Sequence, residues 1–310
     1  MIQEISYGDW KRNLRIRGRT IELVITLEVG PRVIRYAFHD APNVFVEMAG
    51  QLGGTGEQDW MIRGGHRFWV APEGAHSYEL DNEAVTWKKL GETATEIIQP
   101  PSKSSGLQKT LRVELLENEV VRVTHLLTNG GSRPVTMTPW GLSVMAPGGF
   151  ALIPQPTLDV HPMEFSDERV TKPEDFLPNR ELVLWPFTNL MDGRYSFSKH
   201  FLRVAHHPKK PATKIGLKFS TGWVAYQNGE FVFAKHLTFD PASPYPDRGS
   251  NLELFTNDGI LEIESLAPLL PLEPGATRGH VEHWTLHKTA ADLGEEKAAT
   301  GFFAELPAIG

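Results

Sequence analysis

The chain contains no cysteine, and this absence removes several classes of protein at once. Without thiols there can be no disulfide framework, no thiol nucleophile and no cysteine-ligated metal site. Long apolar runs are missing too: no segment approaches the roughly 18 apolar residues of a membrane-spanning helix, and the first residues lack the apolar core of a signal peptide. We therefore expect a cytoplasmic protein that has no membrane partner.

Positive charge is also scarce. The 310 residues include 31 Lys and Arg against 38 Asp and Glu, a formal net charge of -7. Because clustered positive charge supplies most of the affinity for phosphate backbones, this balance argues against a nucleic-acid partner. The one basic run, KRNLRIRGR at 11–19, alternates as a half-solvated strand does, with Arg15 and Arg17 on one face and Leu14 and Ile16 on the other.

Several functional signatures are missing as well. The sequence has no P-loop, no dinucleotide fingerprint and no GxSxG nucleophile elbow. Histidines recur in RGHVEHWTLH at 278–287, but alternation along a strand would place His280 and His283 on opposite faces, and the spacing of a helical HExxH zinc site is not there. We therefore expect neither a metal ion nor a cofactor.

What the chain does contain is a series of short runs rich in β-branched and aromatic residues, which is typical of strands. Asn-Gly and Asp-Gly pairs separate several of them and suit tight hairpins that need positive φ. The runs expected to form strands are 20–29, 32–39, 84–91, 107–117, 119–129, 133–145, 214–220, 222–239, 252–266 and 278–288. Together they predict a long antiparallel meander in an all-β protein.

Only the tail has helical character. Residues 289–306, TAADLGEEKAATGFFAEL, hold good helix formers, with TAAD as a candidate N-terminal cap. The segment at about 154–200 is rich in proline and charge, and because strand-like runs flank it we interpret it as long loops and not as a linker. So many strands with so few helices predict one domain over 1–310, a large two-sheet sandwich or barrel with a short C-terminal helix.

Residues 62–74, IRGGHRFWVAPEG, gather glycine, charge and large aromatic side chains into one stretch. In a strand, His66 would lie on the face opposite to Arg67. Arg67 could hold a pair of hydroxyls or a carboxylate in its fork, His66 could exchange protons near neutral pH, and Glu73 could orient either one. A buried ion pair between Arg67 and Glu73 that braces a loop is an equally good interpretation.

A second group of charges lies in NDGILEIESLAP, at 257–268. In a strand, Glu262 and Glu264 would share one face about 7 Å apart, where each carboxylate disfavours ionisation of the other if water is scarce. One of them could then keep its proton near neutral pH, as a general acid or base must; an ordinary solvent-facing strand is the alternative. Lys235 and Asp247 are further ligand-binding candidates, with an ion pair and an exposed turn as their alternatives.

The stretches GGHRFWVAPE at 64–73 and YELDNEAV at 78–85, followed by 222–239 and 245–288, resemble a bacterial family within the galactose mutarotase-like (aldose 1-epimerase-like) superfamily. The resemblance covers roughly residues 3–290. It implies a β-supersandwich of mostly antiparallel strands, with a carbohydrate ligand bound on the concave face of a large sheet. The eight tryptophans of the chain fit such a ligand.

In aldose 1-epimerases, a glutamate late in the chain takes the proton of the anomeric hydroxyl and a histidine protonates the ring oxygen. The stretch LEIESLAP makes Glu264 the match to that glutamate, with Glu262 second. Where the resemblance places the acid histidine, after LLTNGGSRPVTM, this chain has Trp140. The resemblance therefore implies Glu264 as base, His66 as replacement acid or hydroxyl ligand, Arg67 as substrate clamp and Trp140 as part of a stacking wall.

Three functions stay open at this point. The first is a sugar isomerase of the mutarotase or epimerase type. The second is a noncatalytic carbohydrate-recognition protein that has lost the acid, which Trp140 favours. The third is a glycoside hydrolase or lyase, which needs two carboxylates roughly 5 to 9.5 Å apart around a bond. Glu264 with Glu73 or Glu262 could provide that pair.

Overall fold

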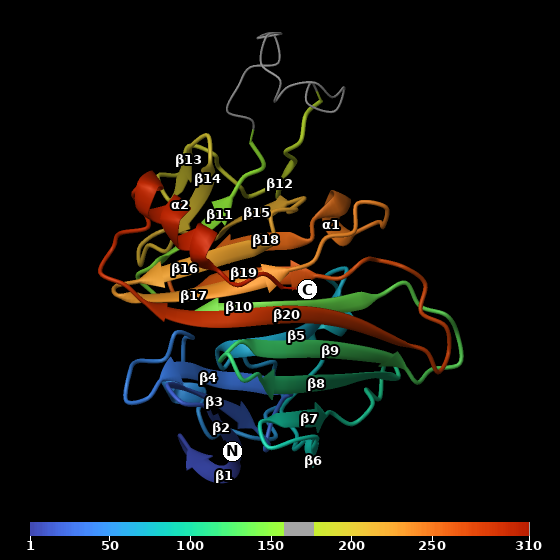
Figure 1. Cartoon of the computed structure of the whole chain (residues 1–310). Coiled ribbons are helices and arrows are strands. Elements are labelled where there is room, and N and C mark those ends of the chain that lie inside the picture. The colour runs from blue at the N-terminus through green and yellow to red at the C-terminus, as the bar shows by residue number, and fades with distance from the viewer. Residues whose placement is uncertain (158–176, 310) are drawn as a thin grey trace.

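The computed structural model describes residues 1–157 and 177–309, and in this part of the chain two ten-stranded sheets make up most of the fold (Figure 1). The first sheet has the spatial order β1 Ile2–Tyr7, β2 Trp10–Arg17, β3 Ile21–Thr26, β4 Arg32–Phe38, β5 Gly65–Ala71, β10 Thr138–Met145, β19 Leu261–Leu266, β18 Leu252–Thr256, β15 Thr213–Leu217 and β12 Leu182–Leu184. The second has the order β13 Tyr195–Phe197, β14 Phe201–Ala205, β11 Phe150–Pro154, β16 Trp223–Asn228, β17 Phe231–Leu237, β20 Thr277–Lys288, β9 Val121–Asn129, β8 Leu107–Leu115, β7 Ala94–Ile98 and β6 Thr86–Lys89.

The strand pairings are antiparallel, which confirms the predicted all-β class. The 222–239 and 252–266 runs form the expected hairpins, β16–β17 and β18–β19. The order is nevertheless more complex than a meander, because β10 lies between β5 and β19 while β20 lies between β17 and β9. The chain changes sheet repeatedly, so segments far apart in sequence become neighbours at the centre of each sheet.

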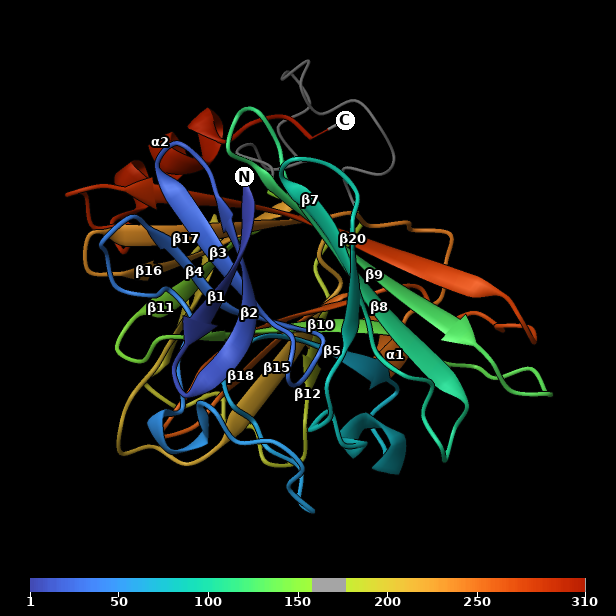
Figure 2. The same ribbon diagram turned by 90° about the horizontal axis from the view of Figure 1, so that it is seen from below.

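The two sheets face each other across one apolar core. Figure 2 shows β1–β4 on the left and β7–β9 on the right, as two separate layers. Leu14 and Leu23 of the first sheet belong to the same buried cluster as Val123 and Trp284 of the second. β9 alternates between buried and half-buried residues, as a strand with one face on a core does. The core therefore occupies the space between the inner faces.

The central strands of the first sheet differ from that pattern, since every residue of β5, β10 and β19 is buried. Their inner side chains pack against the second sheet. Their outer side chains are covered by aromatic residues from neighbouring segments, including Trp60, Tyr78 and Trp185. This covered outer face is where a pocket forms.

The segment at 154–200 is only in part the loop that its composition predicts. Residues 158–176 lie outside the described residues, but β12 and β13 are short strands within the predicted loop. β7 and β11 are also strands that the sequence does not predict. Strands of three to five residues contain too few residues to show a period of two, and pairing with a neighbour stabilises them instead.

Helices are few and short among the described residues: η1 Ala49–Gln51, η2 Ala75–Tyr78, α1 Pro246–Gly249 and α2 Glu296–Glu305. The predicted C-terminal helix is present as α2, but TAAD does not cap it, because the helix begins seven residues after Thr289. Ala299 of α2 packs with Trp223 and Ala234, so the helix covers the outer face of β16 and β17. No helix of the described ranges combines the length and apolar character needed to cross a membrane.

Candidate active site

A pocket of about 310 Å³ lies on the outer face of the first sheet, over β5, β10 and β19. Strand register builds its floor. Leu142 of β10 is directly opposite Arg67 of β5 on one side and Glu264 of β19 on the other. Trp140 is likewise opposite Trp69. Because neighbouring residues in register share a face, these side chains from distant segments all point into the pocket.

Tryptophans form much of the pocket wall, and they include Trp60, Trp69, Trp140 and Trp185. The ring of Trp69 lies edge-on to those of Trp60 and Trp140, with both centroid distances 5.4 Å. Nε1 of Trp140 is buried and has no hydrogen-bond partner among the described residues. A buried donor without a partner is rare, so a ligand oxygen is a suitable acceptor for this indole.

Arg67 lies against this wall and is 3% exposed. Its Nη1 is 2.8 Å from Oε1 of Glu262, and its guanidinium carbon lies 4.6 Å from the ring centre of Trp69. The ion pair anticipated between Arg67 and Glu73 is absent. Glu73 instead sits exposed at the rim of the pocket and accepts a hydrogen bond of 2.6 Å from the Tyr78 hydroxyl.

Lys214, in β15, is a pocket residue that the sequence interpretation missed. Its Nζ lies 2.6 Å from Oε2 of Glu253 and 3.0 Å from Oε2 of Glu264, two residues that face each other directly in β18 and β19. The ammonium also lies 4.8 Å from the ring centres of Trp140 and Trp185. The available sequence signal was a charged residue in an otherwise apolar strand run, KIGL, which needs a buried partner.

Two buried carboxyl groups beside Lys214, Glu264 in the pocket and Glu253 next to it, have raised pKa values. Burial raises the pKa of Glu264 to about 7 in spite of the Lys214 ammonium beside it, and the Glu262 carboxylate adds to the rise. Burial also raises the pKa of Glu253 well above its usual value. Glu264 can therefore gain or lose a proton near neutral pH, as the paired glutamates of β19 predict.

The position of His66 corrects the prediction that this residue acts on the sugar. His66 lies on the opposite face of β5 from Arg67 and is fully buried between the sheets. Its Nδ1 is 2.9 Å from Oγ of Ser143, and its Nε2 is 2.7 Å from Nε2 of His125. Burial lowers the pKa of His66 well below its usual value. The first sheet itself separates this imidazole from the pocket.

Lys235 and Asp247 do not line the pocket either, contrary to their prediction as ligand-binding residues. Lys235 is fully buried between the sheets, where its Nζ donates to Oε1 of Glu282 at 3.0 Å and to the carbonyl of Ile263 at 3.1 Å. Asp247 is half-buried in α1. The ion-pair interpretation of Lys235 is thus the correct one.

The groups around His66 have the spacing of a metal site, since ligand atoms of His66, His125 and Glu282 lie within 4.8 Å of one another. Hydrogen bonds within the protein nevertheless explain why these three side chains lie so close together. Nδ1 of His125 faces the carbonyl of His280 at 3.3 Å, so it must donate, and Nε2 of His125 is then free to accept from His66. Lys235 balances the charge of Glu282. We assign these residues to a structural network.

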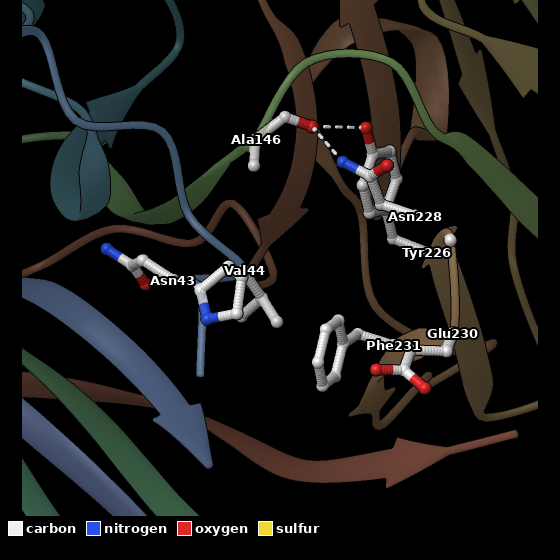
Figure 3. A pocket seen from close by; sticks show the side chains of 9 residues that line it. Asn43, Val44, Ala146, Tyr226, Asn228, Glu230 and Phe231 are labelled. Atoms are coloured by element: carbon white, nitrogen blue, oxygen red, sulfur yellow. Dashed lines mark hydrogen bonds between the residues drawn. The ribbon is translucent and has the colours of Figure 1, made fainter. Parts of the chain in front are cut away.

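A second pocket, of about 340 Å³, lies beside the β16–β17 hairpin (Figure 3). The Tyr226 hydroxyl and the Asn228 amide both donate to the carbonyl of Ala146, at 2.5 and 3.3 Å (Figure 3). Its one carboxylate, Glu230, is exposed and pairs with Lys288. Because these polar groups satisfy one another, the pocket offers less chemistry than the one around Glu264.

Comparisons with known proteins support the fold. No protein-family model matches the chain, and no curated protein matches it by sequence. A TPR-domain containing protein from Parabacteroides distasonis has a solved structure that matches 96% of this chain with a TM-score of 0.60 and 14% identity; the chain spans 49% of that protein.

Two shorter structures match almost end to end. A galactose mutarotase-like protein from Lactobacillus casei covers 89% of this chain and 100% of its own length, with a TM-score of 0.55 and 9% identity. A galactose mutarotase related enzyme from Lactobacillus acidophilus covers 90% and 99%, with a TM-score of 0.56 and 10% identity. The chain therefore has the galactose mutarotase-like sandwich fold that its sequence predicts.

Proposed function

We propose that the chain binds a carbohydrate in the pocket around Glu264 and catalyses exchange between its two anomers. One observation carries this proposal: a buried carboxyl group faces an aromatic pocket and has a pKa raised to about 7. A general base acts best when its pKa lies near the working pH. The mutarotase-like descriptions of two proteins with the same fold agree with this chemistry.

In the proposed reaction, Glu264 takes the proton of the anomeric hydroxyl. The anomeric carbon then becomes a carbonyl carbon as its bond to the ring oxygen breaks and that oxygen gains a proton. The open chain recloses on either face of the carbonyl. Trp69 offers a surface on which the sugar ring can stack, and Arg67, whose Nε has no hydrogen-bond partner among the described residues, can donate to hydroxyls.

Polarimetry tests the proposal directly. We expect the protein to accelerate the rotation change of freshly dissolved α-D-glucose or α-D-galactose above the spontaneous rate. The Glu264→Gln variant should lose at least about 100-fold of this acceleration, the usual contribution of a general base. Glu117→Gln, at an exposed position, is the matched control. Full activity in Glu264→Gln would remove Glu264 from the reaction.

A second candidate function is carbohydrate recognition without catalysis. The observation that favours it is Trp140 at the place expected for the acid histidine, together with the inward direction of His66. Both functions predict that sugars quench or shift the fluorescence of the pocket tryptophans. Sugar binding without any acceleration of anomer exchange would select recognition alone.

A further inference from the structure

The aldose 1-epimerase reaction needs a proton donor for the ring oxygen, and the pocket has a restricted choice of donors. The titratable residues that line it are Arg67, Glu73, Tyr78, Lys214, Glu262 and Glu264. Arginine does not give up its proton in proteins. The Tyr78 hydroxyl already donates to Glu73, and partial burial together with this bond raises the pKa of Tyr78 to about 12.

Lys214 has the position that a donor requires. Its ammonium lines the same pocket as Glu264 and lies 3.0 Å from the carboxylate of that residue. An ammonium has three N–H bonds. Glu264 accepts one of them and Oε2 of Glu253 lies 2.6 Å away as an ion-pair partner, and no third partner of this ammonium occurs among the described residues. One N–H therefore remains for a ligand in the pocket.

We propose that Lys214 replaces the absent histidine and donates its proton to the ring oxygen while Glu264 accepts the proton of the anomeric hydroxyl. This inference rests on the anomer exchange proposed above. The electron pair of the anomeric O–H bond forms the carbonyl π bond, and the pair of the C1–O5 bond stays on the ring oxygen, which takes the lysine proton. On reclosure both protons return, so lysine and glutamate are regenerated.

Charge balance favours such a coupled transfer. Burial lowers the pKa of Lys214, but the carboxylates of Glu264 and Glu253 outweigh it and hold the pKa above its usual value in the resting pocket. When Glu264 becomes protonated, one of these carboxylates loses its charge and the lysine becomes a stronger acid in the same step. The buried ion pair becomes a neutral pair, so no net charge is created in the pocket.

Glu253 has a separate role in this scheme. It is fully buried and does not line the pocket, so it cannot contact the sugar. Its Oε2 lies 2.6 Å from Nζ of Lys214, so it fixes the position of the ammonium. It is a positioning residue for Lys214.

The Lys214→Arg variant tests the proton donation. Arginine keeps the positive charge and can pair with both carboxylates, but it does not release its proton. We expect its kcat for anomer exchange to fall at least about 100-fold while its affinity for the sugar, measured by tryptophan fluorescence, changes little. Lys218→Arg, at an exposed lysine just after β15, should behave as the wild type. Wild-type kcat in Lys214→Arg would overturn the inference.

A measurement on the unchanged protein covers the case in which Lys214→Arg does not fold. In mixtures of light and heavy water, two protons moving in one step give a quadratic dependence of kcat on the deuterium fraction, whereas one moving proton gives a linear dependence. A linear dependence would overturn the inference. The proposed function fails on a different result: a wild-type protein that accelerates no anomer exchange overturns both proposals, whereas an active Lys214→Arg beside an inactive Glu264→Gln overturns only this one.

Discussion

Glu264 shows how a single side chain acquires its chemistry from opposing neighbours. Burial and the Glu262 carboxylate disfavour its charge, whereas the Lys214 ammonium favours it. Arg67 holds Glu262 from the other side of the pocket at 2.8 Å. The result is a carboxyl group that titrates near neutral pH, with both of its protonation states accessible.

This balance predicts the pH dependence of anomer exchange. The carboxylate form of Glu264 is the base, and because its pKa is raised to about 7, we expect the rate to rise as pH increases through 7 and to level off above it. The Glu262→Gln variant removes a negative neighbour and leaves Arg67 unpaired, so both changes lower the pKa of Glu264. Its profile should move to lower pH.

Polarimetric initial rates on both sides of pH 7, with the spontaneous rate subtracted at each pH, measure these profiles. Glu117→Gln is again the control, because it removes an exposed carboxylate that does not line the pocket around Glu264. A rate that falls as pH rises through 7, or an unmoved midpoint in Glu262→Gln, would contradict the assignment of Glu264 as base.

At the scale of the strand, β5 and β10 each direct alternate residues to the pocket on one face and to the network between the sheets on the other. Arg67 and Trp69 of β5 line the pocket, while His66 between them joins the network between the sheets. On β10, Gly141 separates Trp140 from Leu142 and faces that network. A Cβ at position 141 would lie 2.6 Å from Oε1 of Glu282 and 3.0 Å from Nε2 of His125. The missing side chain leaves room for these two groups.

Gly141→Ala should therefore destabilise the protein. The new methyl group must displace buried, hydrogen-bonded side chains, which costs about 1–3 kcal/mol of unfolding free energy by analogy with overpacked cores. Gly279→Ala on β20 is the matched control, because a Cβ there meets only Leu126 at an ordinary 3.5 Å. Urea unfolding measures both. Equal unfolding free energies for the two variants would show that position 141 has room for a methyl group.

At the scale of the whole molecule, the core between the sheets draws on strands from both halves of the chain. Leu14 and Val123 share one buried cluster with Leu254 and Trp284. The network of His66 and His125 with Glu282 and Lys235 crosses the same space. Both halves of the chain therefore contribute to this core.

We accordingly expect residues 1–310 to unfold as a single domain. Far-UV circular dichroism, which reports on the sheets, and tryptophan fluorescence, which reports on the pocket and core, should give coincident urea transitions. Separate midpoints for the two signals, reproduced on refolding, would indicate two independently stable units and would contradict this prediction.

Local patterns account for the part of the fold and site that the sequence predicts. Turn residues and a period of two identify β16–β17 and β18–β19 as hairpins, and they place Glu262 and Glu264 on one face. The same alternation separates His66 from Arg67, which the structure confirms. The short strands β12 and β13, by contrast, contain too few residues to show a period of two. Pairing with neighbouring strands stabilises them instead.

The sequence by itself determined which residues share a face, because alternation along a strand is a property of the backbone. Only the tertiary structure decided which face became the pocket, since β5, β10 and β19 meet through pairings between segments far apart in the chain. It also brought Lys214 to Glu264 and turned His66 inward. Such choices depend on how two sheets bury their apolar faces against each other, and this is a property of the whole chain.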